Sequence, residues 1–365
     1  MIVGIDASRA VSVAPTGTET YSRELIRALL ALDRANTYRL YTRESVSREF
    51  FASAPNIEIR SIPFPRFWTH MRLSVEMLTR PPDLLFVPAH VLPLVHPQRS
   101  IVTVHDLGQL HFPEAYPVRD RQYHDFSARW NVRVASHIFA DSEATRDDLL
   151  EYYGTESAKI TTIYPAYDEK LYRPNAEPLK TEQLRARFRI GNDYILAIGT
   201  IHPRKNYARL IEAFGRLTNR DLQLIIVGKR GWLYESILAR SQGPDVVGRV
   251  QFLDYIPTIE MPALIRGARL LAFPSLHEGF GLPILEAQAC GTPVVCSMTS
   301  SMPEVAGDAA LFVDPLDVDA IAGAVERLLS DGALRAKLIG HGFQNVKRFS
   351  WAQSAHKVLD ILSKT

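Results

Sequence analysis

Two glutamates frame a glycine loop in the segment FPSLHEGFGLPILEA: Glu278 lies in the loop and Glu286 follows eight residues later. The apolar run at 269–273 predicts a strand buried on both faces, and the residues after the loop predict a helix with a proline in its first turn. Gly279 and Gly281 leave main-chain N–H groups open to a ligand, because glycine has no Cβ. The segment therefore predicts a strand, a glycine loop and a helix N-terminus, and such an N-terminus attracts phosphate or pyrophosphate.

The two carboxylates add a second kind of chemistry to this loop. A carboxylate repels phosphate, but each of its oxygens offers two lone pairs to paired sugar hydroxyls. The N–H groups from Phe280 through Gly281 to Leu282 could bind a diphosphate while Glu278 and Glu286 accept hydroxyls. This pattern is typical of a nucleotide-sugar site, with ribose at one end, hexose at the other and diphosphate between. Without its surroundings, such a glutamate pair is more often a solvated helix residue and a cap.

The two glutamates with seven residues between them resemble the Glu-x7-Glu signature of retaining glycosyltransferases, in particular those of family 4. The resemblance covers nearly the whole chain and is most specific over 199–214 and 273–315, which look most similar to bacterial transferases of surface polysaccharide assembly. It implies an α/β fold of the GT-B type, with two Rossmann-like, doubly wound domains facing across a cleft. It also implies that Glu286 holds the ribose hydroxyls and Glu278 a hydroxyl of the transferred sugar. GDP-mannose is the first expectation for the donor.

The segment GTIHPRKN carries two further candidate residues. Arg204 and Lys205 stand just before a predicted helix at 207–217, so two cations and a helix N-terminus could together hold a diphosphate. The alternative is a solvated basic turn. The resemblance implies that Lys205 is the lysine that binds the donor diphosphate. Many members of the family carry arginine directly after the glycine, where this chain has Thr200, and Arg204 could take its place.

Three segments of the first half follow predicted strands and so lie where ligands bind in parallel sheets. His105 comes directly after the apolar run IVTV and would direct its ring into the cleft between the domains; the alternative is a structural histidine. The resemblance implies a histidine here near the transferred sugar, which makes His105 a candidate catalytic residue. Gly17 either contacts the donor or makes a turn, and Asp141-Ser142 resembles a helix cap.

Strand and helix patterns alternate along the chain, which predicts parallel sheets with helices on both faces. The expected strands are short apolar runs at 2–5, 38–41, 57–59, 84–87, 101–104, 137–140, 194–198, 223–227, 250–253, 270–273 and 294–295. The expected helices lie at 21–32, 181–188, 207–217 and 351–362. A linker punctuated by prolines over 165–178 separates an acceptor domain, 1–172, from a donor domain, 173–349. The resemblance implies that the last helix, 350–365, crosses back onto the first domain.

The composition of the chain restricts the compartment and the partners that we expect for it. The chain of 365 residues is long enough for two domains, and its formal net charge of +2 gives no support to nucleic acid as a partner. The two cysteines, Cys290 and Cys296, are expected to be free thiols in a reducing compartment. The N-terminus has no apolar leader, and no run of the sequence is long enough to span a bilayer. We therefore expect a cytoplasmic protein, at most peripheral on the membrane.

The stretch 63–82 reads PFPRFWTHMRLSVEMLTRPP and is aromatic and basic, with proline at both ends. An amphipathic segment could form over 73–78. Side chains such as Arg66, Phe67 and Trp68 could then meet an acceptor, a partner or the anionic inner face of a membrane. Ordinary packing is the alternative.

These features predict a retaining enzyme that moves a hexose from a nucleoside diphosphate sugar, its co-substrate, to a hydroxyl of a glycan or lipid-linked oligosaccharide. Because Arg204 and Lys205 would neutralise the leaving diphosphate, neither a metal nor a cofactor is expected, and the chain has no Asp-x-Asp motif.

A sugar-nucleotide epimerase or a phosphorylase on a similar scaffold is the first alternative, and a sugar-binding protein without catalysis is the second. Binding proteins of this kind are usually exported, so the missing leader counts against one. A nicotinamide dehydrogenase is disfavoured because no GxGxxG fingerprint is present. A glycosidase is disfavoured because phosphate-binding features surround the carboxylate pair.

Overall fold

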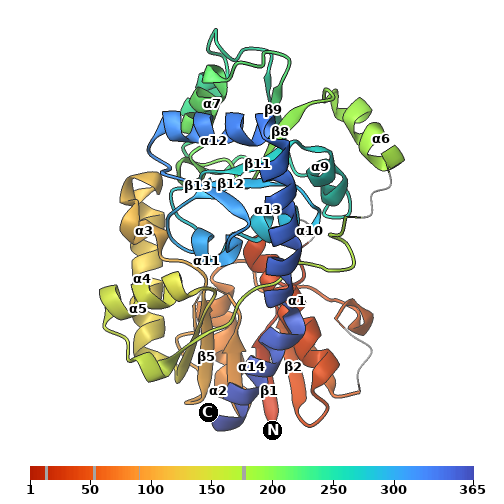
Figure 1. The fold of residues 1–365 in the computed structure, drawn as a ribbon. Helices are drawn as coiled ribbons and strands as arrows, with labels where there is room; N and C mark the ends of the chain where they lie inside the picture. The colour runs from red at the N-terminus through yellow and green to blue at the C-terminus, as the bar shows by residue number, and fades with distance from the viewer. Residues whose placement is uncertain (13–14, 52–54, 90, 175–177) are drawn as a thin grey trace. The chain divides into compact units, whose positions relative to one another are not determined.

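The computed structural model describes residues 1–12, 15–51, 55–89, 91–174 and 178–365, which form two compact units (Figure 1). The first unit comprises 1–107, 122–166 and 349–365, and the second comprises 108–121 and 167–348. The crossing near residue 166 falls in the linker expected over 165–178, of which residues 175–177 lie outside the described part of the chain. The grouping of 108–121 with the second unit has no counterpart in the division expected from the sequence.

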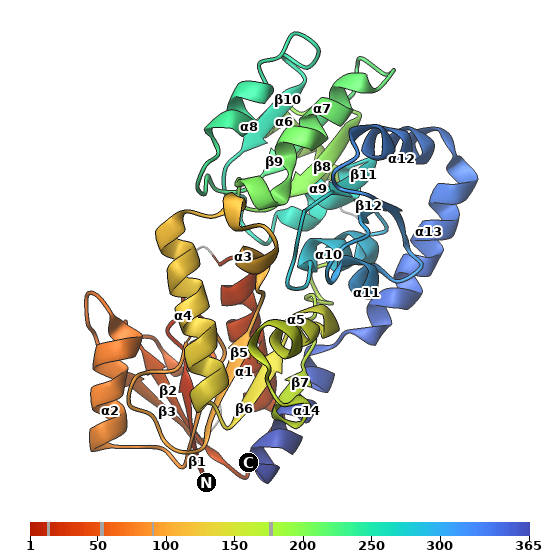
Figure 2. The same cartoon turned by 90° about the vertical axis from the view of Figure 1, so that its left-hand side faces the viewer.

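Seven parallel strands form the sheet of the first unit, in the order β3-β2-β1-β4-β5-β6-β7 (Figure 2). Their bounds are β1 Ile2–Asp6, β2 Thr37–Thr42, β3 Ile57–Ser61, β4 Leu84–Val87, β5 Ser100–Val104, β6 His137–Ala140 and β7 Ile160–Thr162. Strands β4, β5 and β6 are buried along their whole length. Continuous burial suits apolar strands of a parallel sheet that is covered on both faces.

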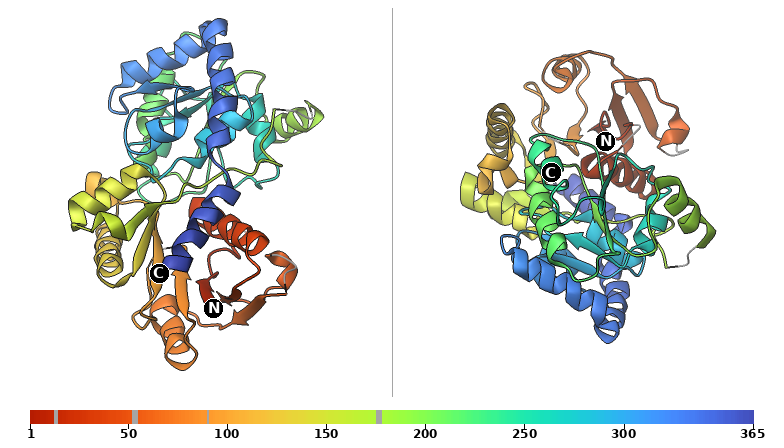
Figure 3. Two further views of the ribbon diagram at one scale, coloured as in Figure 1. Left: turned by 60° about the horizontal axis from the view of Figure 1, so that its bottom comes forward. Right: turned by 90° about the horizontal axis from the view of Figure 1, so that it is seen from above.

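Helices α1 and α14 pack together in the core of the first unit, although they come from opposite ends of the chain (Figure 3). The helices of this unit are α1 Gly17–Leu32, α2 Ser74–Thr79, most of α4 Val118–Val134, α5 Glu143–Tyr153 and α14 Trp351–Lys364. A π-helix spans Trp68–Leu73, and short 3-10 turns span Arg48–Phe50 and Ser157–Lys159. Val358 and Leu362 of α14 are fully buried beside Leu25 and Leu29 of α1. The last helix therefore completes the core of the first unit.

Six parallel strands form the sheet of the second unit, in the order β10-β9-β8-β11-β12-β13. Their bounds are β8 Tyr194–Ile198, β9 Gln223–Val227, β10 Val250–Leu253, β11 Leu270–Phe273, β12 Val294–Ser297 and β13 Ala310–Val313. The order of the strands reverses between β8 and β11, which are neighbours and pair Leu270 with Ile195. In doubly wound sheets, ligands bind beyond the carboxyl ends of the strands at such a switch point. A ligand-binding site is therefore expected at the loops after β8 and β11.

Helices α7 and α12 pack against the strands in the core of the second unit. The helices of this unit are α3 Gly108–His111, α6 Pro178–Phe188, α7 Tyr207–Arg216, α8 Glu235–Arg240, α9 Met261–Gly267, α10 Leu282–Ala289, α11 Met302–Ala306, α12 Val318–Ser330 and α13 Gly332–Asn345. Single 3-10 turns span Pro113–Ala115, Pro203–Lys205 and Val346–Arg348. No helix in the described ranges is both long and apolar enough to cross a membrane.

The predicted fold class is confirmed, because each unit is a doubly wound parallel sheet. One element differs from the expectation. Helix α1 begins at Gly17, so the loop expected over 16–20 is in fact a cap and the first helical turn. A capping box causes this early start: the Thr16 N–H donates to Glu19 Oε2 at 3.0 Å, and the Thr16 hydroxyl donates to the same carboxylate.

Candidate functional site

The loop between β11 and α10 ends in a glycine that the backbone requires. Gly281 has φ of 104° directly before the helix, in a region that L side chains rarely adopt. A Cβ at this position would also lie 3.3 Å from Ile284 Cδ1. Pro283 lies in the first turn of α10, where a missing N–H costs no helical hydrogen bond. The positive end of α10 therefore faces the loop that carries Glu278, as predicted from the sequence.

Glu278 of this loop forms a largely buried ion cluster with two cations of the 3-10 turn Pro203–Lys205. The Lys205 Nζ lies 2.5 Å from Glu278 Oε1, and the Arg204 Nη1 lies 3.8 Å from Glu278 Oε2. Burial alone would raise the pKa of Glu278, but the charges of Lys205 and Arg204 outweigh it and hold that pKa below its usual value. Glu278 is therefore an anion, and its cationic partners stand where β8 and β11 meet.

Two backbone features aim Lys205 at this cluster. Asn206, the next residue, has φ of 60°, and its Nδ2 donates to the carbonyls of Pro274 at 2.9 Å and Pro315 at 2.6 Å. Gly199, just after β8, has φ of 144°, and a Cβ there would lie 2.8 Å from the Lys205 Cε. Gly199 thus leaves room for the aliphatic part of the Lys205 side chain. Asn206 connects the turn that carries Lys205 to the loop after β11 by its hydrogen bond to Pro274.

The same loop is also held by hydrogen bonds from two other segments. The Leu276 N–H donates to the Arg204 carbonyl at 2.9 Å. On the other side, the Glu278 N–H donates to Ser300 Oγ at 3.0 Å, and the Ser301 hydroxyl donates to the Glu278 carbonyl at 2.9 Å. The backbone of Glu278 is therefore fixed before any ligand arrives, which lowers the ordering cost of binding.

Glu286 projects from α10 toward the hydroxyl of Tyr172. Burial raises the pKa of Glu286 to about 7, although the hydrogen bond from Tyr172 works in the opposite direction. Burial also raises the pKa of Tyr172 well above its usual value, and the nearby Glu286 adds to that shift. Glu286 is therefore a carboxyl group that gains or loses its charge near neutral pH.

In the first unit, His105 follows β5 and uses both of its ring nitrogens. Nδ1 lies 2.6 Å from Asp141 Oδ2, and Nε2 lies 3.0 Å from the Pro88 carbonyl oxygen. The ring of Tyr21 packs edge-on against it, with 5.0 Å between centroids. Burial lowers the pKa of His105, but Asp141 and the Pro88 carbonyl outweigh burial and raise that pKa. Burial also raises the pKa of Asp141, while the neighbouring His105 works in the opposite direction, so the ring and the carboxyl share a buried hydrogen bond.

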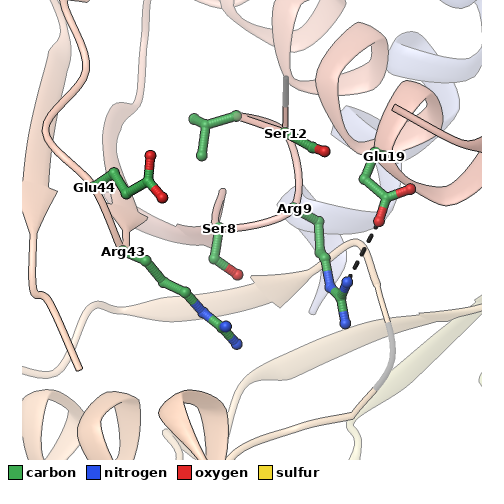
Figure 4. Close-up of a pocket in the computed structure, with 7 residues that line it drawn as sticks. Ser8, Arg9, Ser12, Glu19, Arg43 and Glu44 are labelled. Carbon is green, nitrogen blue, oxygen red and sulfur yellow. Dashed lines mark hydrogen bonds and ion pairs between the residues drawn. The ribbon is translucent and has the colours of Figure 1, made fainter. Parts of the chain in front are cut away.

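A hollow of about 290 Å³ lies in the first unit, where the loops after β1 and β2 meet the start of α1 (Figure 4). It is lined by Ser8, Arg9, Val11, Ser12, Glu19, Arg43 and Glu44. The Arg9 Nη1 lies 3.4 Å from Glu19 Oε1, as the dashed line in Figure 4 shows. Two arginines, two glutamates and two hydroxyls can together bond a polyhydroxyl ligand. Gly17 lies in the same helix as Glu19, and a Cβ there would meet nothing within 4 Å.

The structure brings three of the predicted site residues into contact with one another. Arg204, Lys205 and Glu278 form the ion cluster, the loop 279–282 follows, and Glu286 lies on the next helix. The other two predicted residues, His105 and Gly17, belong to the first unit.

Three contributors were missed from the sequence: Asn206, Tyr172 and Asp141. Of the predicted cap Asp141-Ser142, only Ser142 caps α5, by accepting from the Thr145 N–H at 3.1 Å, whereas Asp141 bonds His105. Asp141 follows an apolar strand just as His105 does, and adjacent parallel strands end at the same edge. That register could have revealed the pair.

Comparison with known proteins identifies the family of the chain. Residues 15–171 match the family described as Glycosyltransferase Family 4, and residues 180–344 match Glycosyl transferases group 1. The O-antigen chain mannosyltransferase B of Escherichia coli is 31% identical over 378 residues, which cover 95% of this chain and 96% of that protein. The serotype-specific mannosyltransferase WbdA of Escherichia coli is 29% identical over 280 residues, which cover 72% of this chain but only 33% of WbdA.

Among solved structures, HepE of Anabaena in complex with UDP-glucose superimposes with a TM-score of 0.78. The two proteins are 18% identical, and the match covers 100% of this chain and 99% of HepE.

Proposed function

The chain belongs to the glycosyltransferases of family 4 and group 1, with the GT-B fold, and from this premise we propose that it transfers a hexose from a nucleoside diphosphate sugar bound in the second unit. The observation that carries the proposal is the ion cluster of Lys205, Arg204 and Glu278 at the switch point of the second sheet. Two largely buried cations beside a helix N-terminus suit a diphosphate, and a fixed carboxylate suits a sugar hydroxyl.

In this proposal each group has one role. Lys205 and Arg204 bind the diphosphate and offset the charge that grows on it as the glycosidic bond breaks. Glu278 accepts a hydrogen bond from a hydroxyl of the sugar, and Glu286 accepts from the ribose. The cations then supply the positive charge that a bound metal would otherwise provide, so transfer should persist in the presence of a chelator.

Mannose is the proposed sugar, and retention of the anomeric configuration is the proposed stereochemistry. Two relatives, the O-antigen chain mannosyltransferase B and WbdA of Escherichia coli, are named as mannosyltransferases, which supports mannose. HepE was solved with UDP-glucose, so the experiment below compares uridine with guanosine nucleotides. Retention is supported by the Glu278 and Glu286 spacing, which resembles that of retaining enzymes.

The proposed acceptor is a hydroxyl of a glycan or a lipid-linked oligosaccharide, bound by the first unit. The hollow lined by Ser8, Ser12 and Glu44 supports this proposal, because hydroxyl and carboxylate groups can bond several sugar hydroxyls at once. His105 is the proposed residue near the transferred sugar. Its Nε2 would have to exchange the Pro88 carbonyl for a sugar oxygen, while Asp141 keeps its contact with Nδ1.

The test is a calorimetric and thermal-shift panel with UDP, GDP, UDP-glucose and GDP-mannose. We expect one nucleotide family to bind, and Lys205→Ala and Glu286→Ala each to weaken that binding by roughly tenfold or more. The matched controls are Lys337→Ala and Glu235→Ala, which remove the same charges from exposed positions of α13 and α8 and should bind as the parent does. Absence of binding by all four nucleotides at millimolar concentration would exclude the proposed donor site.

A further inference from the structure

Four hydroxyl side chains at the end of β12 and in the loop after it bond the backbone of the loop that carries Glu278. The pairs are Ser297 with the Ser275 carbonyl, Thr299 with the Leu276 carbonyl, Ser300 with the Glu278 N–H, and Ser301 with the carbonyls of Glu278 and Phe280. Ser301 differs from the other three because its hydroxyl lies close to two carbonyl oxygens, at 2.9 Å from Glu278 and 2.8 Å from Phe280. The conformation of the loop around Gly279 therefore depends on this one side chain.

Helix capping does not explain a serine at position 301. Ser301 stands directly before α11, where a serine hydroxyl usually accepts a hydrogen bond from an N–H of the first helical turn. Within α11, which the structure describes in full, the Ser301 hydroxyl caps no such N–H. The side chain is 0% exposed, and its one proton is shared between the two carbonyls in a three-centre hydrogen bond. The hydroxyl therefore acts on the loop after β11 and not on its own helix.

The two carbonyls that Ser301 holds determine the direction of two N–H groups. A trans peptide is planar, and its C=O and N–H bonds point in opposite directions. No peptide bond in the described ranges of the chain is cis. The Glu278 carbonyl shares its peptide plane with the Gly279 N–H, and the Phe280 carbonyl shares its plane with the Gly281 N–H. Ser301 therefore directs both glycine N–H groups away from itself.

The N–H groups of Gly279 and Gly281 are buried donors that the protein itself does not use. Both glycines are buried, and among the described residues neither N–H has a hydrogen-bond acceptor. Buried N–H groups in proteins are nearly always paired with protein, water or ligand. The preceding peptide plane is paired at both ends, because the His277 carbonyl accepts from Arg204 at 2.8 Å and the Glu278 N–H donates to a serine hydroxyl at 3.0 Å. Two donors beside the Glu278 carboxyl group thus remain for a ligand.

We propose that Ser301 is a positioning residue for donor binding. Its hydroxyl orients two peptide planes so that the N–H groups of Gly279 and Gly281 donate to donor oxygens beyond the α-phosphate, on the β-phosphate or the hexose. Donors that are fixed before the ligand arrives lose little freedom on binding. A sugar hydroxyl can donate to the Glu278 carboxylate and accept from a neighbouring N–H at the same time. The inference rests on the proposed function, because it takes the donor site beside Glu278 as its premise.

The test is calorimetry of the full chain with two ligand series: GMP, GDP and GDP-mannose, and UMP, UDP and UDP-glucose. In Ser301→Ala we expect the sugar nucleotide to bind about tenfold more weakly, while the affinity for the monophosphate stays within about twofold of the parent. A loss that already appears with the diphosphate places the two N–H groups on the β-phosphate, and a loss confined to the sugar nucleotide places them on the hexose. Ser301→Cys keeps a weak donor of similar size, so its affinities should lie between those of the parent and Ser301→Ala.

Ser241→Ala is the matched control. The Ser241 hydroxyl is also buried in the second unit, and it donates to the Leu238 carbonyl at 2.7 Å just after α8. Its loss should lower thermal stability in the same way but leave all the affinities unchanged. If Ser301→Ala does not fold, Ser301→Cys provides the same comparison.

The outcomes separate the role of Ser301 from the donor site itself. The inference is overturned if Ser301→Ala binds the sugar nucleotide as the parent does. It is also overturned if the variant loses the same affinity for all three ligands of a series, because general disorder of the site would then explain the loss. If the parent binds no nucleotide at all, the proposed function and this inference fail together.

Discussion

Glu278 is held by the same two cations that a diphosphate would attract. A buried carboxylate is stable only with such partners, and removal of one member of a buried ion pair is usually costly. Here the Lys205 Nζ lies 2.5 Å from the carboxylate, with Arg204 close by, so the site already contains its own counter-charge. Binding of a diphosphate would therefore place two anionic groups around the same pair of cations. The carboxylate and the diphosphate should each weaken the interaction of the other with Lys205.

Replacement of Glu278 should consequently separate nucleotide affinity from catalysis. In Glu278→Gln the shape of the side chain is kept and the charge is lost, so UDP or GDP should bind roughly five- to tenfold more tightly. Transfer should fall about a hundredfold, because the amide is a weaker acceptor for the sugar hydroxyl. Calorimetry and a transfer assay measure the two effects, and Glu235→Gln on the exposed start of α8 should show neither. Equal loss of affinity and rate would instead mean that Glu278 mainly holds the loop.

Glu286 should make donor binding depend on pH. Burial raises its pKa to about 7, against the effect of Tyr172, so the carboxyl group is largely protonated below that value. Ribose hydroxyls donate best to the ionised form, so affinity should rise by up to about tenfold between pH of about 6 and about 8, with proton release below about 7. Calorimetry in buffers of different ionisation enthalpy detects both effects. An intact sugar nucleotide is the ligand of choice, because a free diphosphate has a terminal group that titrates in the same range.

Two variants test whether Glu286 is the titrating group. Glu286→Gln should bind more weakly and without this pH dependence. Tyr172→Phe removes a hydrogen bond that lowers the pKa of Glu286, so its binding curve should move to higher pH. A curve that is the same in the parent and in Glu286→Gln would assign the titration to another residue.

At the scale of elements, the ends of β8 and β11 place the reactive groups, and Gly199 leaves the space that the Lys205 side chain occupies. Gly199→Ala should lower the free energy of unfolding by about 1–3 kcal/mol, because φ of 144° is strained for alanine. It should also weaken nucleotide binding, since the new Cβ would lie 2.8 Å from the Lys205 Cε and displace that side chain. Urea unfolding and calorimetry measure the two quantities.

Gly323→Ala in α12 is the matched control for that substitution. A Cβ at Gly323 meets nothing within 4 Å, and alanine favours a helix, so this variant should gain about 0.5–1 kcal/mol and bind normally. If Gly199→Ala binds nucleotide as the parent does, Lys205 is not the residue that the strand end positions.

The sequence patterns predicted the strands and helices more accurately than the contacts between them. The apolar runs predicted 11 of the strands, and the resemblance in the loop from Glu278 to Glu286 is confirmed by the family match. The start of α1 was missed, because a capping box outweighed the helix-breaking tendency of Gly17. The partners Tyr172 and Asp141 were missed as well, since each is distant in sequence from the residue that it contacts. The contact of Asp141 with His105 could have been found from the ends of the two predicted strands, whereas no sequence pattern marks Tyr172 as the partner of Glu286.

The first unit contains both ends of the chain, and this division of the chain leads to a prediction for the whole molecule. The first unit is completed only by α14, whose Leu362 is 1% exposed, while Leu328 of α12 is fully buried in the core of the second unit. Each leucine-to-alanine change should cost about 2–5 kcal/mol, because the removed side chain leaves a cavity. In differential scanning calorimetry, Leu362→Ala should lower the transition of the first unit and leave the stabilisation by the bound nucleotide intact. Leu328→Ala should lower the transition that the nucleotide raises, since ligand binding stabilises the unit that binds it. If both variants lower the same single transition, the two units unfold together, and the donor site depends on the last helix as well.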